Sequence, residues 1–257
     1  MDLENKYGAL EAQQRLLGLL KDFHAFCQKN EVVYSLAAGS LLGAIRHNGF
    51  IPWDDDLDVF LDRDNYKKLM RCLSHHDLFI VERDDADSLW VDRVRRKKDM
   101  DIGGYVPTVD LLVFDNVPDN VVLGKIKLFS LMCLQGMMKQ KPGFNKGTLW
   151  LRICTLVTYC LGRLFPLRWK KAWYRSVSLI GDRRESKNIY FNGPFADIRK
   201  KFPSHIMDKI ELHQFEDTMV CIVSEWDICL KILFGDYMTP PKESDRKPLH
   251  GGLCKND

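Results

Sequence analysis

The 257-residue chain has an ordinary composition, which already excludes several classes of protein. Its 38 Lys and Arg and 35 Asp and Glu leave a formal net charge of +3, and 46% of the residues are hydrophobic. This balance excludes a disordered chain and a strongly basic one. The length provides for one large domain with an ample core.

The cysteines and the N-terminal residues indicate a compartment. Eight cysteines are scattered along the chain, without a C-x-x-C pair or a Cys/His cluster at zinc spacing, so we expect reduced thiols. The first residues, MDLENKYGALEAQQ, contain acids and no apolar stretch, which predicts no secretory signal. We therefore expect a cytoplasmic protein.

The first predicted elements occupy residues 8–47. Apolar residues at helical spacing predict an amphipathic helix over 8–29, and an apolar run predicts a short strand over 32–36. Gly39 and Ser40 end that strand. Ser40 is predicted to be the N-cap of a helix over 41–47.

An acidic run follows the turn at Asn48-Gly49. Asp56 and Asp58 alternate with apolar residues in a strand pattern, and residues two apart share one face of a strand. Asp54 is read as a solvated loop residue, and Asp55 is left open between the loop and a site. Unpaired carboxylates this close repel one another unless a cation or hydrogen bonds compensate.

The next predicted elements are a helix over 64–73 and strands over 89–96 and 105–114. The last of these strands carries Asp110 between two apolar residues. A mixed segment of short strands and helices is predicted over 187–241.

Two apolar stretches, 121–138 and 148–167, are flanked by Lys and Arg. The longest run, between Arg152 and Arg163, is too short to span a bilayer. Two interpretations stay open: a helical insertion that buries its own core, or helices that lie on a membrane surface with basic residues at the edges.

The acids form a pattern that suits metal-assisted phosphate chemistry. Mg²⁺ prefers oxygen ligands, commonly one or two carboxylates together with substrate phosphates. Two such ions can clamp the attacking and leaving oxygens of an in-line displacement. Asp56, Asp58 and Asp110 are the predicted metal ligands and catalytic residues.

Several nearby residues are candidates for binding a phosphorylated substrate. Gly39 would let a phosphate approach the backbone, and the Ser40 hydroxyl and the first helix amides would donate hydrogen bonds to it. Arg46 and His47 would add positive charge. Trp53 and Phe50 would stack on a base or cover a choline-like cation, with core packing as the alternative.

The run VDRVRRKK at 91–98 offers further positive charge. Arg93 and Arg95 share a strand face, and Arg is suited to bidentate phosphate contact; a solvated strand end is the alternative. A nucleic-acid surface would need a longer basic patch with interleaved aromatic residues. We expect no nucleic-acid partner.

These motifs resemble a known family. The stretch AAGSLLGAIRHNGFIPWDDDLDVFL resembles the signature of the LicD family, which includes the fukutin-like proteins and is similar to the nucleotidyltransferase-fold superfamily. VDLLVFDNVP resembles the family segment with the third acid, and FED at 215–217 and LFGDYMTPP continue the resemblance. Phe234 stands where the family usually has Tyr, which removes one hydroxyl.

The resemblance implies an α+β fold, with a nucleotidyltransferase-like mixed β-sheet core, packed helices and a helical insertion. The implied organisation is a catalytic core over 1–118, an insertion over 119–187 that is a candidate for the membrane surface, and a C-terminal segment over 188–257 that completes the domain. His250 resembles a C-terminal histidine of the family that would close over the site.

The resemblance also implies the reaction. It is transfer of a substituted phosphate, such as phosphocholine, from a cytidine nucleotide such as CDP-choline to a hydroxyl of a surface glycan or its lipid-linked precursor, with release of CMP. Asp56 and Asp58 would hold one or two Mg²⁺ ions, which Mn²⁺ can replace, and Asp110 would be a ligand or the base. Such an enzyme would work in the cytoplasm at the inner face of the cell membrane. Nucleotidyl transfer of AMP or CMP, and a non-catalytic subunit of a glycan assembly complex, are the alternatives.

Overall fold

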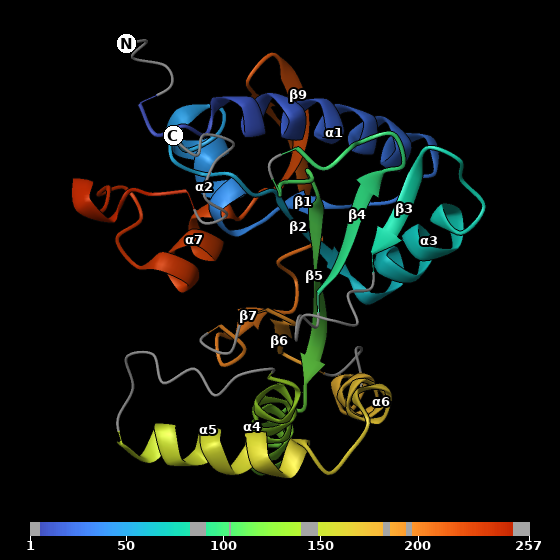
Figure 1. Ribbon diagram of the computed structural model, residues 1–257, viewed down its shortest axis with the longest axis vertical. Coiled ribbons are helices and arrows are strands. Elements are labelled where there is room, and N and C mark those ends of the chain that lie inside the picture. Colours follow the sequence, from blue (N-terminus) through green and yellow to red (C-terminus); the bar gives the residue numbers. More distant parts are fainter. Residues whose placement is uncertain are drawn as a thin grey trace. The chain divides into compact units, whose positions relative to one another are not determined.

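The computed structural model describes residues 6–82, 91–102, 104–139, 149–181, 186–193 and 197–248, with the side chains of 150 and 151 left out (Figure 1). It comprises two compact units. The first unit is Met1–Glu82, Asp92–Val113 and His205–Asp257, and the second unit is Arg83–Val91 and Phe114–Ser204. The domain boundaries expected from the sequence stay a prediction.

The first unit contains a sheet that brings the acidic segments together. Its strands, in sheet order, are β1 (Ser35–Leu36), β2 (Asp58–Asp62), β5 (Val109–Val117), β4 (Asp92–Arg96) and β3 (Phe79–Glu82). The pairs β1/β2, β3/β4 and β4/β5 are antiparallel, and the register of the last pair sets Arg93 opposite Asp110. The Asp110 N–H donates to the carbonyl of Leu57 at 2.8 Å, which fastens β5 beside the acidic run.

The first unit also contains helices. They are α1 (Leu10–Lys29), α2 (Ala38–His47), α3 (Arg63–Leu73), α7 (Trp226–Phe234) and the short 3-10 helix η2 (Glu243–Asp245). The helix predicted over 8–29 is confirmed as α1, whose apolar stripe is buried. The helix predicted over 64–73 is confirmed as α3, which begins after Asp62, whose carboxylate accepts hydrogen bonds from the N–H groups of Asp64 and Asn65.

Three local predictions around α2 are wrong. The helix begins at Ala38, with Ala37 as N-cap, so Ser40 is not a cap. The Ser40 Oγ instead accepts the N–H of Asp58 at 3.0 Å, a contact across 18 residues that outweighs the local capping preference. The early strand is confined to β1, and Asp56 precedes β2 and is not part of the strand.

A β-hairpin completes the first unit. β8 (Ile210–Phe215) and β9 (Thr218–Val223) are joined by Glu216 and Asp217, with Glu216 in the left-handed region at φ 53°. The N–H of Val223 donates to the Oγ of Ser35 at 2.9 Å, which ties β9 to β1.

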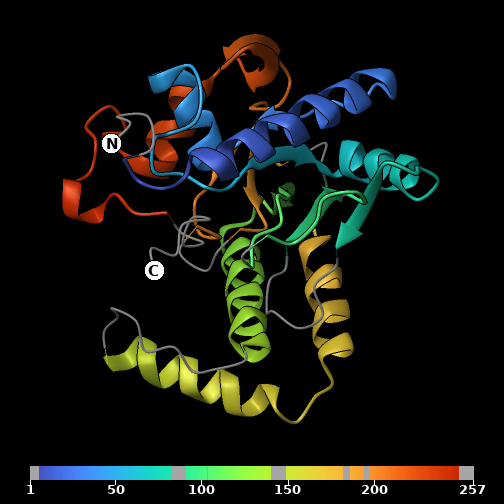
Figure 2. The same cartoon turned by 45° about the horizontal axis from the view of Figure 1, so that its top comes forward.

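The second unit combines the end of β5 with β6 (Asn188–Phe191) and β7 (Phe202–Pro203), paired antiparallel in that order. Its helices are α4 (Val121–Met138), α5 (Leu149–Gly162) and α6 (Leu167–Ser178). Figures 1 and 2 show α5 lying crosswise to α4 and α6. A core cluster holds the unit together: Val117, Leu128, Leu131, Leu134, Met138, Tyr174, Tyr190 and Ile198.

The predicted α+β fold is confirmed, with mixed strands and helices in the described residues. One described helix, α4, is long and apolar enough to cross a membrane by length and composition alone, with a mean hydropathy of 1.5. The buried share of that helix is 44%, and its buried side contributes to the core cluster. Such a helix is equally typical of a protein core.

Candidate active site

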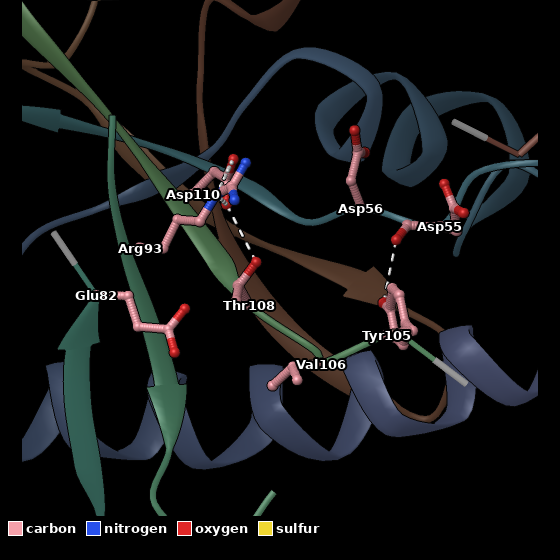
Figure 3. A pocket seen from close by; sticks show the side chains of 9 residues that line it. Asp55, Asp56, Glu82, Arg93, Tyr105, Val106, Thr108 and Asp110 are labelled. Atoms are coloured by element: carbon pink, nitrogen blue, oxygen red, sulfur yellow. Dashed lines mark hydrogen bonds and ion pairs between the residues drawn. The ribbon is translucent and has the colours of Figure 1, made fainter. Parts of the chain in front are cut away.

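A polar pocket lies in the first unit where β3, β4 and β5 approach the acidic run (Figure 3). Its lining residues are Asp55, Asp56, Glu82, Arg93, Gly104, Tyr105, Val106, Thr108 and Asp110. Asp55 and Asp56 come from the segment before β2, while the other acids come from β3 and β5. Four carboxylates and a single guanidinium therefore face one cavity.

Asp110 is held by neighbours on both sides. Its Oδ1 lies 3.1 Å from the Nε of Arg93, its direct partner across the two strands. The Oγ1 of Thr108 donates to the same oxygen at 3.2 Å. Both side chains of the ion pair are about a fifth exposed, so the pair is open to a ligand in the pocket.

The acidic run carries strong mutual repulsion. Burial raises the pKa of Asp58 well above its usual range, and the charges of Asp56, Asp110 and Asp54 raise it further, against the opposing charge of Arg93. Burial likewise raises the pKa of Asp54, with Asp56 as the next cause. The three predicted metal ligands therefore lie close enough to affect one another electrostatically.

Helix α2 positions the run through its glycines. A Cβ at Gly39 would stand 2.6 Å from Oδ2 of Asp54, and one at Gly43 would stand 2.4 Å from the carbonyl oxygen of Gly49. The loop after α2 can lie against the helix only because both positions lack a side chain. In this structure the space beside Gly39 is filled by Asp54.

The solvated-loop interpretation of Asp54 is wrong, because its carboxyl is largely desolvated against α2. Asp55, which the sequence left open, is not a solvated loop residue: it is 1% exposed and belongs to the pocket lining. Its carbonyl oxygen accepts the hydroxyl of Tyr105 at 3.1 Å. Tyr105 thus fixes the run to the segment that leads into β5.

A second cluster, outside the pocket lining, contains Arg46, His47 and Trp53. The ring of Trp53 contacts that of His47 edge-on, and the guanidinium of Arg246 lies over it at 5.1 Å. Arg46 donates to the carbonyl of Tyr237 at 2.9 Å. Burial, followed by the charge of Arg46, lowers the pKa of His47.

The remaining candidates differ in their surroundings. Arg95 forms an ion pair with Glu82, which lines the pocket. Arg95 itself does not line the cavity. Phe50 is 7% exposed and packs edge-on against Phe215, as core. His250 lies outside the described residues.

Sequence reasoning missed two positioning residues, Glu216 and Tyr105. The Oε1 of Glu216 accepts the N–H of Phe50 at 2.9 Å, and its own N–H donates to the carbonyl of Asn48 at 2.7 Å. Glu216 therefore secures the turn that leads into the acidic run. The FED motif signalled that this residue matters, but nothing local showed what it would contact.

The donor set fits a hard cation chemically, because clustered carboxylates with raised pKa values gain from a divalent positive charge. Across the described ranges, however, no three His, Cys, Asp or Glu side chains stand ready-assembled around one metal position. Mg²⁺ commonly takes only one or two protein carboxylates and completes its shell with substrate phosphates and water. The residues present satisfy that smaller requirement.

Comparison with known proteins agrees with this site. Residues 31–117, which include the acidic run and Asp110, match the family described as LicD/FKTN/FKRP, nucleotidyltransferase domain. The whole chain is similar to the lipopolysaccharide cholinephosphotransferase LicD of Haemophilus influenzae, at 26% identity over 93% of this chain and 95% of that protein. The resemblance to the LicD family is thereby confirmed, and it supports a transferase.

Two shorter similarities are to uncharacterised proteins. An uncharacterised protein of Rickettsia typhi is 34% identical over 26% of this chain and 25% of its own length. A second one, from Rickettsia prowazekii, is 52% identical over 17% of this chain and 16% of its own length. Neither name adds a function.

Proposed function

We propose that this chain transfers a substituted phosphate, such as phosphocholine, from a cytidine diphosphate-type donor to a hydroxyl of a surface glycan or its lipid-linked precursor, with release of CMP and dependence on Mg²⁺. The observation that carries the proposal is that Asp56, Arg93 and Asp110 line one pocket, with Asp58 close enough for the charges of Asp56 and Asp110 to raise its pKa. Similarity to a cholinephosphotransferase over nearly the whole chain supports the class of group transferred.

Each residue has a role in this proposal. Asp56 and Asp58 would hold Mg²⁺, which when bound supplies the positive charge that a diphosphate needs. Arg93 orients Asp110 and leaves a guanidinium beside the pocket for a phosphate oxygen. Because Asp110 already accepts hydrogen bonds from Arg93 and Thr108, it is suited to hold and orient the reacting groups more than to accept a proton.

The proposed compartment is the cytoplasm, where a nucleotide donor is available. In the described part of the chain the cysteines are free: Cys27, Cys72, Cys133, Cys154, Cys160, Cys221 and Cys229. Free thiols are compatible with a reducing compartment.

A thermal-shift panel tests donor class and metal together. The purified protein is heated with CDP-choline, CDP-ethanolamine, CDP-ribitol, CTP or ATP, each with and without Mg²⁺. A ligand at 100 times its Kd stabilises the folded state by about 2.7 kcal/mol, which gives a readily measured shift. We expect a cytidine diphosphate donor to stabilise the protein only with Mg²⁺.

Product analysis then separates the candidate reactions. With a donor labelled in both the head group and the base, we expect free labelled CMP and a labelled head group on the acceptor. A nucleotide on the acceptor would establish nucleotidyl transfer instead. If the protein showed neither donor binding nor Mg²⁺ dependence, it would be identified as a non-catalytic subunit. The same assays are run on the variant Asp58→Asn. Its matched control is Asp64→Asn, which changes an exposed carboxylate on α3.

A further inference from the structure

The second unit carries a long segment with charge of one sign only. From Asn120 to Gly181 the sequence has eleven Lys and Arg and no Asp or Glu. The rest of the chain has 27 basic and 35 acidic residues, so the near-neutral total hides a strong separation of charge. A segment of this kind favours an anionic partner.

Helix α5 lies in this segment and is apolar on most of its surface. Of its residues with a described exposure, only Gly162 is buried. The large apolar residues exposed from 149 to 164 are Leu149, Ile153, Leu156, Val157, Leu161 and Leu164. A helix that is apolar on all sides is normally buried in a protein core or in a membrane. Its surroundings in the unit do not supply that burial.

Helix α5 packs on α4 along one narrow side. A Cβ at Gly136 would stand 2.3 Å from Oγ1 of Thr158, and one at Gly162 would stand 2.0 Å from the carbonyl oxygen of Met137. The Thr158 hydroxyl bonds to the carbonyl of Cys154 within its own helix. Small residues with internally satisfied polar groups allow this close helix contact.

Among the described residues of the unit, none covers the opposite side of α5. At 3.6 residues per turn, Ile153, Leu156 and Val157 lie on the side of the helix away from Thr158 and Gly162. Each is more than 40% exposed. The apolar face is therefore continuous along the middle of the helix.

Exposed basic and aromatic side chains occur in the same segment as this face. Exposed residues of this kind on α5, on α6 and between them are Arg152, Arg163, Arg168, Trp169, Trp173 and Arg175. Trp and Arg beside an apolar face are typical of segments at the boundary between lipid tails and head groups. With 14 residues, α5 is about 21 Å long, shorter than the roughly 30 Å hydrocarbon core.

We propose that α5, with the exposed ends of α6, is a docking surface for an anionic lipid bilayer, in which α5 lies in the plane of the interface. The apolar face enters the region below the head groups, and the arginines contact lipid phosphates. Charge complementarity selects this occupant, because a protein partner would require neither a uniformly basic segment nor exposed tryptophans. The lysines buried in the same unit, Lys127 and Lys170, are engaged with carbonyl oxygens and take no part.

Vesicle flotation of the full chain tests the proposal without donor or acceptor, so its outcome is independent of the proposed function. Vesicles of phosphatidylcholine alone are compared with vesicles that contain one quarter phosphatidylglycerol. We expect the bound fraction to be at least several-fold higher on the anionic vesicles, and to fall when NaCl is raised to 0.5 M.

Two sets of variants separate the contributions. Ile153→Gln/Leu156→Gln/Val157→Gln is expected to lower the partition coefficient at least about tenfold, and Arg152→Gln/Arg163→Gln/Arg168→Gln to remove the preference for anionic lipid. Val33→Gln/Leu212→Gln/Met219→Gln, exposed apolar positions of the first unit, is the matched control and should bind as the parent does. Circular dichroism and the thermal midpoint show that each variant is folded.

A bimane label on Cys160 of α5 reports the depth of the helix, in a background in which Cys154, the partly buried Cys72, Cys133 and Cys221, and Cys254 are changed to Ser. Quenching by a nitroxide lipid labelled near the head group supports the proposal. The proposal is overturned if the α5 glutamine variant binds like the parent or if neither vesicle binds the chain. A dimer that shields the label without vesicles would assign the face to a second copy. Resistance to alkaline extraction would show that a helix spans the bilayer.

Discussion

Buried charge is compensated differently in the two units. In the second unit, Lys127 is 3% exposed and donates hydrogen bonds to the carbonyl oxygens of Asn116, Ser178 and Ile180. In the first unit, the pKa of Asp58 is raised by burial and by other carboxylates, with Arg93 as the opposing charge. The charge of Lys127 is compensated by carbonyl oxygens of the fold, whereas the negative charge around Asp58 is opposed by Arg93 alone among the charges named here.

The difference shows what each charge is for. A buried charge whose hydrogen bonds are all made internally stabilises the fold and has little left for a ligand. A group of carboxylates with too few compensating positive charges lowers the stability of the free protein. The same group favours binding of a cation, or of a cation with its substrate. Opposite effects of neutralisation in the two units would sharpen this contrast.

The largest expected effect is on turnover in the first unit. Asp58→Asn keeps the shape of the side chain but removes a charge on which the proposed metal site depends, so we expect at least about a thousandfold loss of transfer. The same change relieves repulsion and should raise the thermal midpoint of the metal-free protein. Initial rates and thermal unfolding measure both. Unaltered turnover would contradict the assigned role.

Neutralising the buried lysine of the second unit should have the opposite effect on stability. Lys127→Met leaves three carbonyl oxygens without their donor and should lower the free energy of unfolding by about 3 kcal/mol. Denaturant unfolding gives the value. Lys125→Met, an exposed position two residues earlier, is the control and should stay within about 0.5 kcal/mol of the parent.

A smaller effect is expected at the turn that leads into the acidic run. Glu216→Ala leaves the N–H of Phe50 without its acceptor and should cost about 2 kcal/mol of stability, together with a lower kcat. Glu216→Gln retains an acceptor oxygen and should restore most of both. If the two variants behaved alike, the hydrogen bond would not be the reason.

The smallest effect concerns pH. The raised pKa values of Asp54 and Asp58 mean that the folded protein holds protons which the unfolded chain releases, so stability falls as pH rises from the ordinary carboxyl range through the raised values. The lowered pKa values of His24 and His47 act in the opposite direction. The difference between parent and Asp58→Asn, followed by thermal unfolding from pH 5 to 8, isolates the aspartates.

Mg²⁺ should offset the loss of stability at high pH in the parent protein but not in Asp58→Asn. At pH 8 the ion is expected to raise the thermal midpoint of the parent and to leave that of Asp58→Asn nearly unchanged. Equal shifts in both proteins would indicate a general salt effect. Ca²⁺ and 0.1 M NaCl serve as comparison conditions.

The sequence alone determined the α+β class, helices α1 and α3, and the strand that carries Asp110. Periodicity and end signals are local, so they can be read without knowledge of the fold. It also indicated the family, because the acidic signature is contiguous. Two of its errors were at Ser40 and Asp56, where a local capping rule and a strand pattern yielded to a contact between α2 and β2.

Only the tertiary structure decided which residues meet. The pairing of β4 with β5 set Arg93 against Asp110, and the hairpin brought Glu216 to the turn beside Phe50, contacts between residues 17 and 166 positions apart. It also decided that α5 remains mostly exposed while one side of α4, a helix as apolar as α5, lies in a core with Tyr174 of α6. Local sequence fixes which face of an element is apolar, but long-range pairing and packing determine what, if anything, covers it.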